Sequence, residues 1–252
     1  MPLGVSGKNW ENPNIDYLKF SLSLLKEQTI PVKITCAVDE NLQPDRLEIV
    51  KQYAHKIVTF PKHSYFRPGG IWKKIWECWK ESDCEYLKWN SYDDYIDRRS
   101  CAFQLQTIKS FNANACFCSN YNNNHGNVRK VNDGNLNFKQ FIGQHPMYMG
   151  GFLLNRKAIL NSGLDQYKNS WSYYFEGILY AFICKTGKIV NNPNAMFYYR
   201  DHSGTISETC REKEAWVQEA VKEVGYSFSD CKKDWDSINF NKLCEEIKRN
   251  YR

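Results

Sequence analysis

Two adjacent carboxylates follow an apolar segment of this chain. Asp93 and Asp94 end the run Ser91-Tyr92-Asp93-Asp94, directly after a strand expected over residues 85–90. Neighbouring carboxylates after a strand suit a hard divalent cation such as Mg²⁺ or Mn²⁺, which would offset the charge of a diphosphate. On residue types alone, however, a solvated turn or the N-cap of a following helix is the preferred interpretation.

The spacing of apolar residues predicts the elements that must position this pair. We expect strands over residues 2–5, 32–38, 56–60, 85–90 and 115–119, and helices over about 15–27, 45–55, 71–79 and 98–112. Such alternation is typical of an α/β fold with a mixed, mostly parallel central sheet flanked by helices. Ligands bind beyond the carboxyl ends of such strands, and Asp39 stands at a second such end.

The rest of the chain is less regular. Residues 120–135 are rich in Asn and Gly and predict a loop, and 148–155 form an apolar run. Short strands are expected over 188–190 and 196–199. After residue 207, two charged amphipathic helices are expected.

Composition limits the classes of partner. The formal net charge is +6, and no run of five like charges is present, which argues against nucleic-acid binding. A mild positive balance suits an anionic small ligand or an acidic membrane surface. We find no signal peptide and no apolar run of 18 residues, so we expect a cytoplasmic protein with no transmembrane segment, peripheral to a membrane at most.

The 10 cysteines include no CxxC pair. They favour buried thiols in a reducing compartment. Cys116 and Cys118 share one face of a strand, which is a weak indication of a metal site.

Four stretches of the chain, in order, resemble the family 2 glycosyltransferases of GT-A fold. The run from Tyr86 to Ile96, followed by Gln104-Leu105-Gln106, is similar to the DxD region of that family, where a strand ends in D-x-D-D. Residues 17–28 resemble the helix after its first strand, 34–39 its second strand, and 198–207 its closing "YR.H..s.S" stretch. Each stretch is weak alone, but four in order over residues 2–207 are a strong indication.

The resemblance implies a GT-A-like domain over 1–207, with a donor half of about 1–98 and an acceptor half of 99–207. A helical extension over 208–252 would pack on it. The implied reaction transfers a sugar, with inversion and with Mn²⁺ or Mg²⁺, from a nucleoside-diphosphate sugar of UDP or dTDP type. The acceptor would be a hydroxyl of a glycan or lipid-linked glycan. The oligomeric state stays open.

For the donor site, the resemblance assigns a role to each acidic strand end. Asp39 would accept a hydrogen bond from the imide N–H of the uracil or thymine base. The alternative is that Asp39 is a turn residue. Asp93 takes the metal-ligand place, and His202 is the natural additional ligand, or a structural histidine. Ser91 replaces the first Asp of D-x-D-D and offers only a neutral hydroxyl. The nucleotide-sugar would contact Asp39, Ser91, Tyr92, Asp93, Asp94, Lys73 and Arg200, with Lys73 alternatively a solvated cation.

On the acceptor side, the resemblance assigns the catalytic base to Glu176, which would take the proton of the attacking hydroxyl. The alternative is a glutamate at a helix N-terminus. Gly150 and Gly151 would let the backbone approach a sugar. Trp171 and Tyr173 would stack on the acceptor or belong to the core.

Two other classes stay open. A sugar nucleotidyltransferase normally has a Gly-rich phosphate loop near its N-terminus, and residues 4–8 are too sparse in glycine for one. A non-catalytic glycan-binding relative is the other, because Ser91 replaces an expected Asp.

Overall fold

A computed structural model of the chain describes residues 2–3, 13–61, 70–122, 127–129, 134–135, 149–167, 179, 182–183 and 186–200. The helices are α1 (Ile15–Lys26), α2 (Pro44–Tyr53), α3 (Gly70–Glu81), α4 (Ser100–Phe111) and α6 (Arg156–Leu160), with 3₁₀ turns η3 (Met149–Gly151) and η4 (Leu164–Tyr167). The strands are β1 (Pro2–Leu3), β2 (Thr35–Asp39), β3 (Lys56–Phe60), β4 (Tyr86–Lys88), β5 (Tyr95–Ile96), β6 (Ala115–Asn122), β7 (Asn127–Arg129), β8 (Gly134–Asn135), β9 (Phe152–Asn155) and β10 (Ile189–Tyr199).

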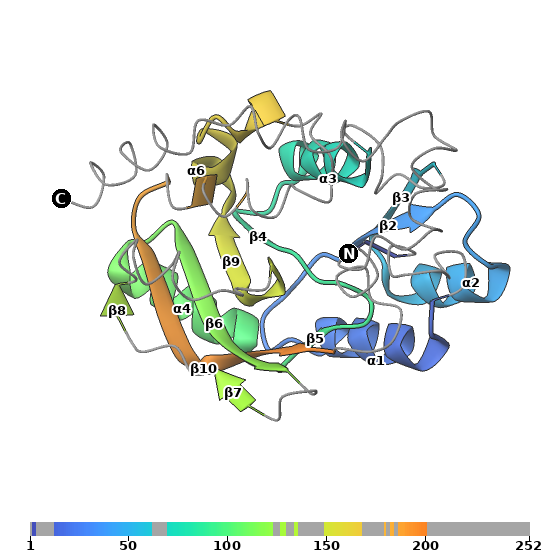
Figure 1. The fold of residues 1–252 in the computed structure, drawn as a ribbon, viewed down its shortest axis with the longest axis horizontal. Helices are drawn as coiled ribbons and strands as arrows, with labels where there is room; N and C mark the ends of the chain where they lie inside the picture. Colours follow the sequence, from blue (N-terminus) through green and yellow to red (C-terminus); the bar gives the residue numbers. More distant parts are fainter. Residues whose placement is uncertain are drawn as a thin grey trace, which may run out of the picture.

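These strands form two sheets (Figure 1). The first is parallel, in the order β1-β2-β3. The second has the order β4-β9-β6-β10-β5, with β7 on β6 and β8 on β10. The two longest ladders, β2–β3 and β6–β10, are both parallel, while the shorter strands of the second sheet add antiparallel pairs. The predicted mixed α/β fold is confirmed.

Helices cover both faces of the first sheet. Cys36 and Val38 of β2 pack in an apolar cluster with α1 and α2, whereas Ala37 between them packs in the cluster of α3. Figure 1 shows α3 on one side of β2 and β3, and α1 with α2 on the other. Successive residues of a strand point to opposite faces, so the middle of β2, residues 36–38, is apolar because both faces of the strand are buried.

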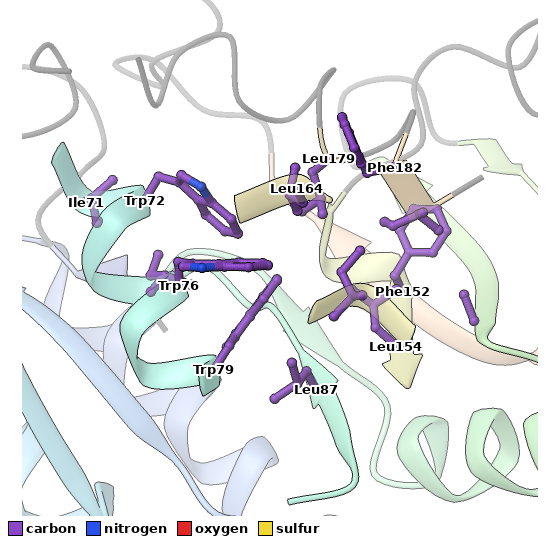
Figure 2. Packing of buried hydrophobic residues seen from close by; sticks show 14 of the residues in the cluster. Ile71, Trp72, Trp76, Trp79, Leu87, Phe152, Leu154, Leu164, Leu179 and Phe182 are labelled. Carbon is purple, nitrogen blue, oxygen red and sulfur yellow. The ribbon is translucent and has the colours of Figure 1, made fainter. Parts of the chain in front are cut away.

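Helix α3 buries the largest aromatic cluster among the described residues. Its apolar residues recur at helical spacing, and those that are buried are Ile71, Trp72, Ile75, Trp76 and Trp79. Figure 2 shows the three indoles facing Leu87 and the side chains of β9 and η4. The indole Nε1 of Trp76 donates to Asp165 Oδ1 at 2.6 Å, so this large core keeps a polar link to η4.

Helix α1 begins where the sequence predicts, because the side chain of Asn14 accepts from the backbone of Asp16 and Tyr17. At its other end Gln28, which is buried, donates to the carbonyls of Leu24 and Asp97 and accepts from the backbone of Cys101. This single amide therefore joins the end of α1 to the start of α4.

Two predictions about the second half are wrong. Part of the loop expected over 120–135 is sheet, since β6 continues to Asn122, and β7 and β8 follow. The two short strands expected near 188–190 and 196–199 are one strand, β10, which pairs with β6 on both sides of an irregularity between Asn192 and Met196. Pro193 lies there and cannot donate to a ladder, and Asn192 caps the bulge by accepting from Asn194 and Ala195.

The described cysteines form no disulfide with one another. Cys36, Cys101, Cys116 and Cys118 are buried, as predicted. Burial raises the pKa of Cys118 to about 11, so its thiol stays neutral at neutral pH. Within the described ranges, no helix has the length and hydrophobicity needed to span a bilayer. The domain boundary near 207 and the extension after it lie outside those ranges.

Candidate functional site

The acidic turn lies between β4 and a short strand that sequence reasoning missed. Asp93 and Asp94 are 7% and 8% exposed, so the turn is not solvated. They do not cap a helix either, because β5 follows them and α4 begins only at Ser100. The structure therefore excludes both a solvated turn and a helix N-cap at Asp93 and Asp94. Two buried carboxylates need polar or charged surroundings.

A network of neutral hydrogen bonds sets the shape of this turn. The side-chain amide of Asn90 donates to Ser21 Oγ at 2.9 Å, to the carbonyl of Ser91 at 2.8 Å and to that of Asp94 at 3.2 Å. Ser21 in turn donates to the carbonyl of Ser91 at 3.3 Å. The turn is therefore fixed to α1 by hydrogen bonds to Ser21 and to backbone carbonyls, and these four bonds use neither carboxylate.

Sequence reasoning missed both of these residues, although each left a signal. Ser21 lies on the buried face of α1 beside Leu18 and Leu22, where a polar residue needs a partner. Asn90 is a polar residue between the expected strand and the acidic turn, where its amide can bind the backbone of the turn, and in the structure it is 3% exposed.

Asp94 joins the turn to the end of β10. Its Oδ1 accepts from the backbone nitrogen of Arg200 at 3.0 Å. The guanidinium of Arg200 lies 3.7 Å above the ring centroid of Tyr17 on α1 and 5.5 Å from that of Tyr95. Burial raises the pKa of Tyr95, so its phenol is neutral at neutral pH and attracts Arg200 through its ring.

Arg200 keeps one unused donor at this position. Its Nη1 atom is buried and makes no hydrogen bond within the part of the chain that the structure describes. An unsatisfied buried donor costs about 1–3 kcal/mol, and more on a charged group, so an anionic partner for Arg200 is favoured.

Asp39 lies at the second acidic strand end. It is 2% exposed, and its Oδ1 accepts from the backbone nitrogen of Asn41 at 2.8 Å and from the Asn41 side chain at 3.3 Å. This is the geometry of an Asx turn, which supports the alternative reading of Asp39 as a turn residue. Tyr92 packs in the same apolar cluster as Val38, so the acidic turn lies against the strand that ends in Asp39.

Gly150 and Gly151 have a packing role. Both are buried, a Cβ on Gly150 would overlap the Phe197 ring, and one on Gly151 would lie 2.6 Å from the Phe117 ring. Both positions require glycine because the Phe197 and Phe117 rings occupy the space of a Cβ.

Of the remaining predicted residues, the structure describes Lys73 alone. Lys73 is exposed on α3, away from the tryptophans, as a solvated cation would be. Trp171, Tyr173, Glu176 and His202 lie outside the described residues. Among the residues that are described, no group of three or more His, Cys, Asp or Glu is placed to hold a metal ion.

The fold is shared with solved structures of S. aureus TarS, a glycosyltransferase. TarS 1–349 in complex with UDP-GlcNAc is 14% identical at a TM-score of 0.60, over 77% of this chain and 58% of that chain. Its complex with UDP is 13% identical at 0.58, over 82% and 60%. A longer TarS structure is 13% identical at 0.58, over 74% and 35%.

The chain therefore spans three fifths or less of the TarS chains that it matches. No family model and no curated protein matches its sequence. At this level of identity the likeness establishes only the fold that the chain shares with TarS.

Proposed function

We propose that the protein is a glycosyltransferase that takes its sugar from a nucleoside-diphosphate sugar of UDP or dTDP type. The observation that carries this proposal is the buried acidic turn, which is held to α1 by Asn90 and Ser21 and to β10 by the Asp94–Arg200 hydrogen bond. The shared fold supports it, since TarS was solved with UDP and with UDP-GlcNAc.

In the proposed donor site, the cation and the carboxylates have separate tasks. Arg200 would bind the diphosphate, because it combines a fixed position on Tyr17 with an unused donor. Lys73 would approach the diphosphate from α3, and Asp39 would accept from the imide of the base. Ser91, Tyr92 and Asp94 would contact the nucleotide-sugar around Asp93.

The residues of the turn fit a hard cation, because carboxylate and hydroxyl oxygens are the donors that Mg²⁺ and Mn²⁺ prefer. The resemblance gives Asp93 the metal-ligand place, so Asp93 is the carboxylate that we assign to the ion, with His202 as the proposed additional ligand. When bound, the ion would stabilise the negative charge of the leaving diphosphate.

In the proposed transfer, the acceptor hydroxyl oxygen attacks the anomeric carbon as the bond from that carbon to the diphosphate oxygen breaks. The carboxylate of Glu176 takes the hydroxyl proton, and the nucleoside diphosphate leaves from the opposite face, with inversion. The acceptor would be a glycan or lipid-linked glycan lying on Trp171 and Tyr173, near Gly150 and Gly151.

A thermal-shift panel of UDP, dTDP, GDP and CMP, each with and without Mn²⁺, tests the donor site. A ligand at 100 times its Kd stabilises the protein by about 2.7 kcal/mol. We expect UDP or dTDP with Mn²⁺ to raise the Tm, and Asp93→Asn to remove the part that needs Mn²⁺. If no nucleotide shifts the Tm, the donor site is refuted, and a non-catalytic role in glycan binding becomes the better account of Ser91.

The catalytic base needs its own test. Glu176→Gln keeps the size of the side chain but cannot take a proton, so we expect it to abolish transfer and leave the UDP shift intact. Full activity in this variant would refute the assignment of Glu176. Pyrophosphate release from a nucleoside triphosphate and a sugar phosphate would instead indicate a nucleotidyltransferase.

A further inference from the structure

Lys88, which the proposed reaction does not use, makes a set of hydrogen bonds inside the second sheet. It is the last residue of β4, and its Nζ donates to Gln104 Oε1 at 3.1 Å, to the carbonyl of Gly150 at 2.6 Å and to that of Phe152 at 3.3 Å. An ammonium has three donors, and all three are used.

Gln104 completes the arrangement from α4. It is fully buried, and its amide nitrogen donates to the carbonyl of Gly151 at 2.8 Å and to that of Cys116 at 2.9 Å. The carbonyls of three consecutive residues, 150 to 152, are therefore bound by two side chains, which we call the Lys88–Gln104 clamp.

The same turn is held from its other side. The Phe197 ring fills the space where Gly150 would carry a Cβ, and the Phe117 ring does so for Gly151. Residues 150–152 thus have carbonyls fixed by hydrogen bonds and α-carbons fixed by aromatic rings. Backbone held in this way is preorganised for a ligand.

Lys88 supplies the only charged group of the Lys88–Gln104 clamp. Within the described residues, its ammonium faces neutral oxygens, and burial raises the pKa of the nearby thiols Cys101 and Cys118. A half-buried cation is costly to desolvate, and its three hydrogen bonds offset that cost only while the Gln104 side chain and the carbonyls of residues 150 and 152 stay in place. The lysine therefore ties its own stability to the position of these carbonyls.

We propose that Lys88, together with Gln104, is a positioning residue that fixes the backbone of residues 150–152 relative to the acidic turn. Lys88 precedes Asp93 by five residues, so the two lie within about 17 Å along an extended chain. The clamp would hold the backbone that receives the acceptor at a set distance from the leaving diphosphate. This inference rests on the proposed function.

The test compares Lys88→Met, Lys88→Arg and wild type in the full chain. Methionine has a similar length but cannot donate, so we expect its kcat/KM for the acceptor to fall about tenfold or more, since misplacing reacting groups by about 1 Å costs that much. The Kd of UDP should stay within about twofold of wild type. Arginine retains donors and should recover part of the loss.

Two further variants keep the result interpretable if Lys88→Met is unstable. Gln104→Met loses its hydrogen bonds to Gly151, Cys116 and Lys88 without adding a charge, and it leaves the bonds from Lys88 to residues 150 and 152, so it should give a smaller loss of the same kind. Ile108→Ala, which creates a cavity one turn further along α4, is the control for general loosening of that helix. It should leave the KM for the acceptor unchanged.

Amide hydrogen exchange over residues 149–155 gives a readout that does not need activity. We expect faster exchange there in Lys88→Met and unchanged exchange in Lys33→Met, which changes only an exposed ion pair with Asp83. Unchanged exchange together with unchanged acceptor kinetics overturns the clamp, as does an equal acceptor effect in Ile108→Ala. If wild type transfers no sugar, the proposed function fails, and the exchange result alone decides on the clamp.

Discussion

The carboxylate of Asp94 accepts a hydrogen bond from the backbone nitrogen of Arg200, 106 residues further along the chain. The Arg200 guanidinium lies on Tyr17, so this bond brings three stretches of sequence to one place. Each of those stretches belongs to the resemblance that the sequence carries. The three stretches are weak patterns in the sequence, and they define a candidate site because Tyr17, Asp94 and Arg200 lie together in the structure.

Replacing Asp94 tests the importance of that bond. A hydrogen bond to a charged group contributes about 1.5–3 kcal/mol, so we expect Asp94→Ala to lower the free energy of unfolding by about 2 kcal/mol. Asp94→Asn keeps an acceptor oxygen and should lose less than half as much. Urea denaturation of the three proteins measures the difference, and equal losses for the two variants would show that charge, not the bond, dominates.

Elements with a clear apolar period could be predicted from the sequence. The tryptophan spacing of α3, the alternation in β2 and the Asn14 cap are local features, and all appear at or near the expected residues. The position of Asp39 and of the acidic turn at strand ends follows from the same reasoning. These features depend on neighbours within a few residues.

Features that depend on distant partners could not be predicted. Strand β5 has two residues and exists because β10 pairs with it, and β7 and β8 likewise depend on β6 and β10. The partners of Lys88 are 16 to 64 residues away, so nothing local distinguishes it from a solvated lysine. The need for Gly150 and Gly151 arises from rings on β10 and β6.

Asn90→Asp should be the most damaging single change to the acidic turn. The amide donor would become a carboxylate facing the carbonyls of Ser91 and Asp94, now 2.8 and 3.2 Å from that nitrogen. Lost bonds and repulsion together should cost about 3 kcal/mol or more. Ser21→Ala, which loses only the hydroxyl, should cost about 1 kcal/mol. Denaturant unfolding checks both, and a harmless Asn90→Asp would contradict the described network.

Gly150→Ala should destabilise the protein through overlap with the Phe197 ring. Overpacking of this kind costs about 1–3 kcal/mol. In a Phe197→Leu background the added methyl group has more room, so the two changes together should cost less than the sum of their separate effects. A strictly additive result would show that the ring does not set the requirement for glycine.

Stability should fall in alkaline solution because of Cys118. Burial raises the pKa of its thiol from 9.0 to about 11, so between these values the unfolded chain loses a proton that the folded chain keeps. The free energy of unfolding is therefore unaffected by this thiol below pH 9. It falls as the pH rises from 9 toward 11, by about 2–3 kcal/mol in all. Cys118→Ala should flatten this part of the stability curve. An unchanged slope would contradict the buried neutral thiol.

Ser91→Asp should strengthen the dependence of nucleotide binding on metal. In the family that the sequence resembles an Asp occupies this place, and Ser91 is only half-buried, so a carboxylate has room. Without metal, the added charge lies beside Asp93 and Asp94 and should lower the Tm, because like charges close together repel. With Mn²⁺ and UDP the introduced carboxylate becomes a metal ligand, so the rise in Tm on adding both should exceed the rise in wild type. Ser91→Asn, which adds a similar volume without charge, should give no such gain. If Mn²⁺ raises the Tm of Ser91→Asp no more than that of Ser91→Asn, the acidic turn does not bind the metal through this position.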